Sequence, residues 1–331
     1  MTSQQNLTAF VTESAAARHR GAVLVAAAAI AAPWVLDAYT ISLGSYAIVL
    51  GLVAVSVHLL TVNAGLPTLG QGAYLIIGGY TAATVSTDLT SNGLIQLLAG
   101  TVAAALAAAL VGIFATRTRA TTFLISTLAV GVLTQTLASR AVPVTGGDAG
   151  RTVEPITLWP GTLAVTSIGY LYLYALACAF TLMGVVALLL RSRFGLALRA
   201  ISGHELRTRA SGHPADRLLW LAYIVAGGVA GAAGAILVAV RHTIAPADGG
   251  FVVSALALLA ALLTTRTPAG AMLGAVIIVA VRDLLAPAVL AGHAAALLGA
   301  VFLAAAGRGV AVQVIRRWQR CLTAVLQWGR R

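Results

Sequence analysis

Long, uninterrupted runs of apolar residues dominate the chain and alternate with short polar connections. A run of about 20 apolar residues is long enough for one helix to cross a bilayer. We interpret the first run as an uncleaved helix rather than a signal peptide, because many more follow it. The chain is therefore expected to be an all-α, polytopic transmembrane helical bundle. The pattern predicts about ten spans, over residues 21–36, 39–60, 64–86, 93–115, 120–140, 169–190, 217–240, 250–265, 268–287 and 289–306.

The composition agrees with a chain that lies mostly in the bilayer. Of the 331 residues, 60% are hydrophobic and 9% are charged, whereas soluble domains carry roughly 25% charged residues. Such a chain cannot cover a water-exposed surface, which excludes a soluble enzyme. The net charge of +12 is better explained by membrane topology than by nucleic acid, so no nucleic-acid partner is expected.

All 21 basic residues are arginine, and the chain contains no lysine. A P-loop needs a lysine to reach the β- and γ-phosphates, and Schiff-base chemistry needs a lysine amine. No catalytic motif occurs either, and Cys178 and Cys321 do not have metal-binding spacing. We therefore expect no enzyme activity, no cofactor and no metal, and any energy from ATP must come through another chain.

The arginines predict how the spans are oriented. With the N-terminus inside, 17 arginines fall on inner segments, and cytoplasmic loops of membrane proteins carry such an excess. Most acidic residues map to the outer side. An even number of spans, with both termini in the cytoplasm, is therefore expected. The outer side holds four arginines, Arg140, Arg151, Arg241 and Arg282.

Polar segments divide the chain into regions. Residues 1–20 are predicted to be a cytoplasmic tail and residues 21–306 a single transmembrane domain. Within that domain, the outer loop 141–168 and the inner loop 191–216 are too long to be simple turns. Residues 307–331 intersperse apolar side chains with arginines, which predicts a basic amphipathic helix at the surface of the lipid bilayer.

The inner loop carries the first candidate site. Leu196–Ser211 mixes apolar side chains with arginines, as in a short amphipathic helix at the membrane surface, and Gly212 and Pro214 are stop signals. Such a helix can dock into a groove on a soluble partner. The alternative is an interfacial loop whose arginines only fix the topology. The expected apolar anchors are Phe194 and Ile201, and the expected polar contacts are Arg199, Glu205 and Arg207.

The glycine-rich segment 63–80 is the second candidate site. Glycine and proline at membrane depth are tolerated where freed backbone groups line a cavity or meet neighbouring helices, and an interrupted helix is typical of a transporter's substrate path. A break is expected near Gly65–Gly72. Close packing through small residues is the alternative, and it is favoured for Gly227, Gly228, Gly231 and Gly234. The path candidates are Asn63, Gly65, Thr68, Gly70, Gln71, Gly72 and Tyr74.

Isolated polar residues inside apolar runs are weaker candidates. An unpaired charge at membrane depth costs roughly 2.5–3.5 kcal/mol, and neighbours such as Arg282 and Asp283 point about 100° apart on an α-helix. Their partners are therefore expected on other elements, with both residues at the outer rim. His58 is interpreted as a packing residue, with a proton relay as the alternative.

Three segments resemble parts of permease subunits of branched-chain amino-acid ABC transporters, and they follow one another along the chain in the order expected for that family. The inner loop, RSRFGLALRAISGHELRTRASG, resembles the cytoplasmic loop of that family. The stretch VHLLTVNAGLPTLGQGAYLIIGGYTAA is similar to the family's signature in the membrane, and VTGGDAG is similar to its outer Thr-Gly-Gly loop. The span after the inner loop, LLWLAYIVAGGVAGAAGAILV, is also similar to the next span of that family, and together these segments cover about residues 55–240.

The resemblance implies a multi-pass permease in a bacterial-type inner cell membrane. Phe194–Gly212, which includes Gly195, would be the coupling loop that meets the ATPase. The implied partners are two ATP-binding subunits that hold ATP and Mg²⁺, a second homologous or identical permease subunit, and an extracytoplasmic solute-binding protein. Thr68 and Gln71 would face the channel between the two permeases.

The expected function is inward translocation of branched-chain or other small amino acids by ATP-driven alternating access. Urea, amides or another small polar solute remain alternatives, because the residues that line an apolar solute pocket cannot be recognised from the sequence. A proton-coupled secondary carrier that uses His58 or Asp283 is the alternative from another class. A purely structural membrane subunit is the third alternative for the function.

Overall fold

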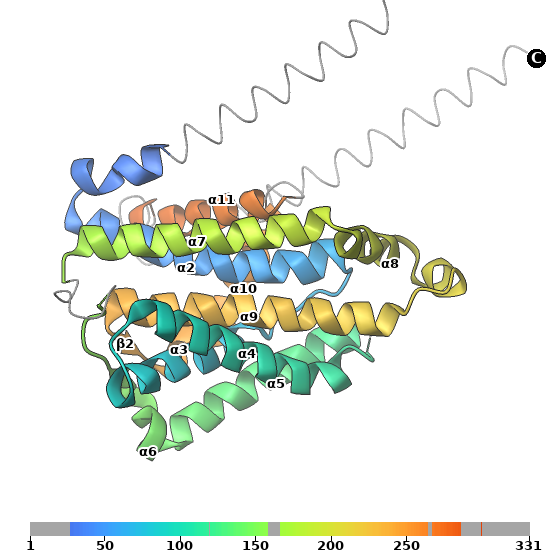
Figure 1. The fold of residues 1–331 in the computed structure, drawn as a ribbon, viewed down its shortest axis with the longest axis horizontal. Coiled ribbons are helices and arrows are strands. Elements are labelled where there is room, and N and C mark those ends of the chain that lie inside the picture. Colours follow the sequence, from blue (N-terminus) through green and yellow to red (C-terminus); the bar gives the residue numbers. More distant parts are fainter. Residues whose placement is uncertain (1–26, 119, 158–165, 264–266, 286–298, 300–331) are drawn as a thin grey trace, which may run out of the picture.

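The computed structural model describes residues 27–118, 120–157, 166–263, 267–285 and 299. Within them the chain is a bundle of long helices that lie roughly side by side (Figure 1). The predicted tail 1–20, nearly all of the last span and the C-terminal helix 307–331 lie outside the described residues. The all-α class is confirmed.

A helical stretch over residues 27–35 precedes the longer helices. The longer α-helices are α2 (Ala38–His58), α3 (Gln71–Asp88), α4 (Gly93–Ala115), α5 (Ala120–Arg140), α7 (Ile168–Arg191), α8 (Arg193–Ala210), α9 (Ala215–Arg241), α10 (Phe251–Leu263) and α11 (Pro268–Val279). The shorter elements are the π-helices η1 (Leu59–Asn63) and η4 (Ala280–Leu285), the helix α6 (Val142–Thr145), the 3-10 helices η2 (Gly147–Ala149) and η3 (Pro246–Gly249), and the antiparallel strands β1 (Arg151–Thr152) and β2 (Thr243–Ile244).

Six helices among the described residues are long and apolar enough to cross a membrane. A multi-pass membrane protein is therefore confirmed, whereas the number of ten spans and the orientation of the termini stay predictions. The predicted span 64–86 is wrong in its first part, because residues 64–70 are not helical and α3 begins only at Gln71. The six are Ala38–Asn63, Gly93–Ala115, Thr121–Arg140, Ile168–Arg191, Ala215–Arg241 and Pro246–Leu263.

Local signals explain where individual helices begin. The side chain of Asn92 accepts hydrogen bonds from the backbone N–H groups of Leu94 and Ile95 and so caps the first turn of α4. Thr267 caps α11 in the same way, and Pro268 follows at the first helical position, where its missing N–H costs no hydrogen bond. The Thr267 cap separates two apolar runs, 250–265 and 268–287, that hydropathy alone leaves almost continuous.

Small residues let α9 pack tightly at the centre of the bundle, against α3 and α4. A Cβ on Gly231 would collide with Ala104, and one on Gly78 would collide with the backbone of Gly231. Gly234 lies just as close to the backbone of Leu75. The packing interpretation is therefore confirmed for Gly227, Gly231 and Gly234, whereas a Cβ on Gly228 would make only an ordinary contact with Ala105. α2 lies beside α9 and also contacts α7, α10 and α11.

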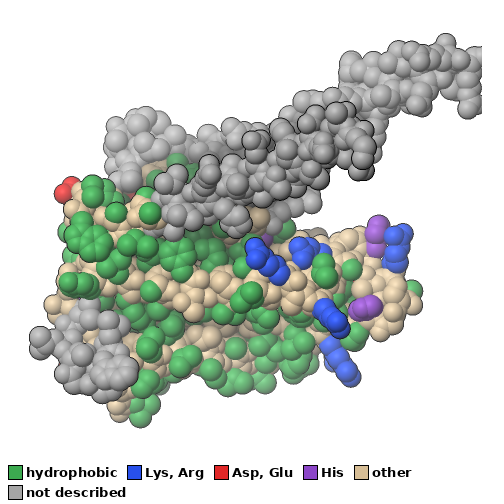
Figure 2. Space-filling view, turned by 45° about the horizontal axis from the view of Figure 1, so that its top comes forward, with side chains coloured by type: hydrophobic (Ala, Val, Ile, Leu, Met, Phe, Trp, Pro, Cys, Tyr) green, Lys and Arg blue, Asp and Glu red, His purple; other side chains and the backbone are tan. Residues whose placement is uncertain are grey.

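The two ends of the bundle differ in charge. At one end, α8 extends beyond the other helices, and arginine and histidine side chains gather there above an otherwise hydrophobic face (Figures 1 and 2). We call this the α8 end. At the other end, Arg151 lies 3.7 Å from Asp88, and Arg241 forms a 3.1 Å ion pair with Asp248. We call this the loop end; the positive-inside rule predicts that it faces outward.

Candidate functional site

The α8 helix occupies the predicted coupling loop. The expected stop is present, because α8 ends at Ala210 and Gly212 follows with a φ of +82°, a left-handed conformation that favours glycine. The helix starts earlier than expected, at Arg193, and is kinked at His204, whose φ of −153° and ψ of 86° are not helical. α8 packs against α7, α9 and η1, so it is fixed to the bundle.

The apolar residues of α8 divide between two faces. Leu198 and Ile201 are buried, Ile201 with only 4% of its surface exposed, and Phe194 is half-buried against the core. The interpretation of Ile201 as an anchor for a partner is therefore wrong, because this side chain holds α8 to its own bundle. The exposed apolar side chains are Leu196 and Leu206, 61% and 84% exposed. Helical spacing in the sequence already separates these two groups of apolar residues, because positions 194, 198 and 201 share one face of a helix and position 196 does not.

The charged residues of α8 are largely engaged within the chain. Arg209 forms ion pairs with Glu205 at 2.9 Å and with Asp216 at 2.5 Å. These hydrogen bonds, first that to Glu205, raise the pKa of the Arg209 guanidinium. Arg199 donates to the carbonyls of Leu190 and Gly195, and thereby covers the C-terminal end of α7. Glu205 and Arg199 thus shape the α8 surface, while Arg207 is exposed on it.

The interruption expected near Gly65–Gly72 is present. η1 ends at Asn63, α3 begins at Gln71, and Gly65 has a φ of +73°. The backbone N–H groups that the break leaves without helical partners form hydrogen bonds to side chains within the protein. Such hydrogen bonds are needed because no water is available in the hydrocarbon core of a bilayer. The N–H of Leu69 donates to Thr127 Oγ1 at 3.3 Å, and that of Gly72 donates to Ser254 Oγ at 3.1 Å. The N–H of Gly70 donates to Thr68 Oγ1 at 3.2 Å.

Thr68 and Gln71 do not face a surface that a second permease could share, because both are fully buried within this chain. That part of the prediction is wrong: the neighbouring helices α2, α5 and α10 enclose the segment. Gln71 Oε1 accepts a 3.4 Å hydrogen bond from Ser56 Oγ. Among the described residues, Gln71 Nε2 has no hydrogen-bond partner. A spare polar group is thus enclosed in the centre of the bundle.

The other path candidates have structural roles. Tyr74 is fully buried; its hydroxyl donates to that of Tyr223 at 2.9 Å, and the two rings pack edge to face. Asn63 Nδ2 donates to the carbonyl of His58. Gly70 and Gly72 allow close approach, because a Cβ would collide with the backbone of Thr127 and of Gly249, respectively. These residues therefore pack or hydrogen-bond within the bundle, and their part in a solute path stays a prediction.

Gly65 connects the two candidate sites. A Cβ on Gly65 would lie 3.1 Å from the hydroxyl of Ser202 on α8. The far end of the same segment, at Gly72, packs against Gly249 in η3. Residues 64–70 therefore run from the base of α8 into the centre of the bundle.

Arg282 and Asp283 pair with each other. Arg282 Nε and Nη2 donate to the two carboxylate oxygens of Asp283 at 2.9 and 3.0 Å. The expectation that the two neighbours do not pair with each other is wrong, because the long arginine side chain in the π-helix η4 folds back to Asp283. Arg282 also has a partner on another element, since its guanidinium carbon lies 5.3 Å from the centroid of the Tyr46 ring on α2. His58 is fully buried on α2.

The comparison with protein families agrees with this arrangement. The model of the family described as branched-chain amino acid transport system, permease component, matches residues 39–306, which is more than half of the chain. No individually curated protein and no solved structure gives a significant match. The match spans both candidate sites and the helices that hold them. The chain therefore belongs to the family of permease components of branched-chain amino acid transport systems.

Proposed function

We propose that the chain is the membrane-spanning subunit of an ATP-driven importer in a bacterial-type inner membrane, and that it moves small amino acids inward by alternating access. In this proposal two partner subunits bind ATP and Mg²⁺ and hydrolyse ATP. A second permease, identical or homologous, completes the translocation path, and an extracytoplasmic binding protein delivers the solute. Family membership and the chain's lack of lysine support this division of labour.

The observation that carries the proposal is the two-faced geometry of α8. Leu198 and Ile201 attach one face of α8 to the bundle, while Leu196 and Leu206 are exposed on the same helix. Arginine side chains gather at this end of the molecule (Figure 2). Exposed apolar anchors on a helix, with charged residues around them, are what a groove on a soluble partner recognises. A helix held firmly on one side can transmit a movement of that partner to the bundle.

The segment 64–70 can transmit a displacement of α8 to the interior of the bundle. Because Gly65 packs on Ser202, a displacement of α8 pushes on the start of this segment. Its other end carries Gln71, whose hydrogen bond to Ser56 Oγ is long, at 3.4 Å, and whose amide nitrogen has no partner among the described residues. We infer that opening at this point exposes Thr68 and Gln71 to the passing solute.

A substitution at Leu206 tests the coupling role. Leu206→Asp should abolish solute-stimulated ATP hydrolysis and uptake in membranes that contain the partner subunits, because it places a charge at the centre of the docking contact. Insertion and thermal stability should not change, since Leu206 is 84% exposed. The matched control is Phe114→Asp: Phe114 is also an exposed apolar residue, on α4, at the same end of the bundle.

Two results would contradict the proposal. Normal coupled uptake by the Leu206→Asp protein would exclude docking through this face of α8. Solute accumulation by the purified chain alone, driven by a proton gradient without ATP, would instead identify a secondary carrier. Uptake of urea or amides in place of amino acids would change the solute class but leave the coupling mechanism intact.

A further inference from the structure

A second polar site lies at the loop end of the bundle. A cavity of about 250 Å³ opens between the first half of α2, the end of α9 and the π-helix η4. Its lining combines apolar residues such as Leu237 and Val240 with charged and hydroxyl groups. None of these residues belongs to the α8 face or to the segment 64–70, so the cavity is separate from both candidate sites.

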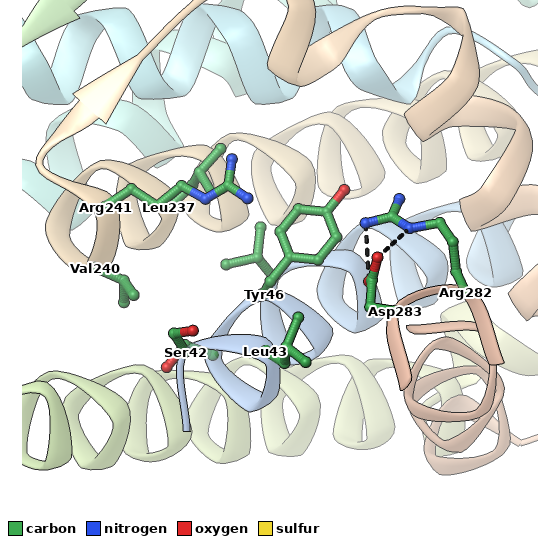
Figure 3. Close-up of a pocket in the computed structure, with 10 residues that line it drawn as sticks. Ser42, Leu43, Tyr46, Leu237, Val240, Arg241, Arg282 and Asp283 are labelled. Carbon is green, nitrogen blue, oxygen red and sulfur yellow. Dashed lines mark hydrogen bonds and ion pairs between the residues drawn. The ribbon is translucent and has the colours of Figure 1, made fainter. Parts of the chain in front are cut away.

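Two arginines from different elements meet in this cavity. The guanidinium carbons of Arg241 and Arg282 lie 4.9 and 5.3 Å from the centroid of the Tyr46 ring. Figure 3 shows both side chains turned toward that ring, with Asp283 paired to Arg282. Stacking on an aromatic ring restricts a guanidinium to one orientation and so prepares it to bind.

The N–H donors of the two arginines that remain unused favour a hydrogen-bond acceptor as ligand. Each guanidinium has five N–H donors, of which Asp248 takes one from Arg241 and Asp283 takes two from Arg282. Donors are therefore left for a further acceptor. Both guanidinium groups are ion-paired, Arg241 with Asp248 and Arg282 with Asp283, so the unused N–H donors rather than a net positive charge are what the cavity offers to a ligand. Arginine binds planar carboxylates particularly well, through parallel N–H···O bonds.

We propose that this cavity binds the carboxylate group of the transported solute at the outer end of the permease. The apolar part of the lining, which includes Leu43 and Val49 from α2, suits a short branched alkyl group. Its designation as a site on the transport route rests on the proposed function, whereas carboxylate binding as such does not. The Arg282–Asp283 pair holds one guanidinium in place until the solute arrives.

Binding can be measured on the full chain alone, in nanodiscs of neutral phosphatidylcholine. The probe is isovalerate, a branched carboxylate, and its matched control is 3-methylbutanamide, which has the same shape without the charge. Saturable binding of isovalerate, followed by saturation-transfer NMR, is expected. The amide should bind about tenfold more weakly or not at all, because it cannot form charged hydrogen bonds with two guanidinium groups.

Variants test whether the two arginines are responsible. Arg282→Gln combined with Asp283→Asn removes the ion pair without leaving one charge unpaired, so the protein should fold normally and lose isovalerate binding. Arg241→Gln should weaken binding by about tenfold or more. The control is Arg151→Gln, which changes another ion-paired arginine at the same end of the bundle but outside the cavity.

Three results would overturn the inference: no saturable binding of isovalerate, equal binding of the amide, or unchanged binding in the double variant. If anionic phosphatidylglycerol occupies the cavity and isovalerate does not, the site is a lipid phosphate site and the inference also fails. Normal ATP-driven uptake without isovalerate binding would reject this site alone. Isovalerate binding with uptake that needs no ATPase would reject the proposed function alone.

Discussion

His242 joins α9 to β2 in a backbone conformation that most residues avoid. Its φ is +56°, and among the described residues it is the only one other than glycine with a positive φ. Two backbone hydrogen bonds hold it there: its N–H donates to Val238 O, and its carbonyl accepts from Val153 N, both at 2.8 Å. Burial lowers the pKa of its imidazole below the usual value of about 6.5.

The lowered pKa makes stability depend on pH at this residue. Between pH 6.5 and the lower folded pKa, the unfolded chain binds the proton more readily, so stability falls as the pH falls through this range. His242→Asn keeps a residue that tolerates the left-handed conformation and removes the titrating group. We expect the difference in unfolding midpoint between pH 7 and pH 5 to be smaller in the variant. An unchanged or larger difference would contradict this account of His242.

Gln71 allows a test that separates transport from folding. Gln71→Leu removes an amide nitrogen that has no partner among the described residues, and Ser56 keeps its 2.7 Å hydrogen bond to Val53 O. No buried polar group loses its last partner, so stability should be unchanged or slightly higher. Uptake should fall strongly if this side chain contacts the solute. Wild-type uptake by the variant, measured with labelled amino acid, would remove Gln71 from the path.

At the residue scale, the sequence indicated which side chains have unusual chemistry for their position, but it did not indicate which side chains are buried. It indicated that Thr68 and Gln71 stand at an unusual polar position, and the structure places them at the break. It could not show that both are enclosed, because the enclosing groups, such as Ser254 and Thr127, lie far away in the chain. Ile201 was misassigned for a different reason: helical spacing places it on the same face as Leu198, which is buried, but it does not say whether that face packs on the bundle or on a partner.

At the scale of single elements, α9 depends on a few positions without side chains. Gly231→Ala should destabilise the bundle by about 1–3 kcal/mol, the usual cost of overpacking, because its methyl group would collide with Ala104. Gly228→Ala, on the same helix, is the control, since a Cβ there would meet Ala105 at an ordinary 3.5 Å. Thermal unfolding in detergent measures both. Equal stability of the two variants would mean that the α4–α9 contact at Ala104 can accommodate an added methyl group.

Elements were predictable where one local rule dominates. The long apolar runs and the Asn92 and Thr267 caps define α4 and α11 with little need of tertiary contacts. The break before α3 was predictable from the glycines and proline of residues 64–70, but hydropathy did not give the residue at which α3 begins. There Gly65 and Pro67 end the helix. Hydrogen bonds to side chains of other helices, such as Thr127, stabilise the non-helical backbone at membrane depth.

At the scale of the whole molecule, charge separates the two ends of the bundle. The α8 end gathers exposed arginines, whereas the loop end pairs Arg151 and Arg241 with acidic residues. The sequence predicted this asymmetry from the positive-inside rule. In the proposed mechanism, the α8 end meets the ATPase and the loop end meets the arriving solute, and residues 64–70 connect α8 to the interior.

The coupling role of α8 is the central claim, and site-specific crosslinking tests it most directly. A photoreactive p-benzoylphenylalanine replaces Leu206 in cell membranes, and the same change at Phe114 provides the control. After irradiation, Leu206→p-benzoylphenylalanine should crosslink to a soluble-side protein that carries a P-loop lysine motif, and the crosslink should weaken when ATP is trapped. A protein crosslinked from Leu206 that lacks this motif, or no crosslink at all while the transporter remains active, would contradict the account.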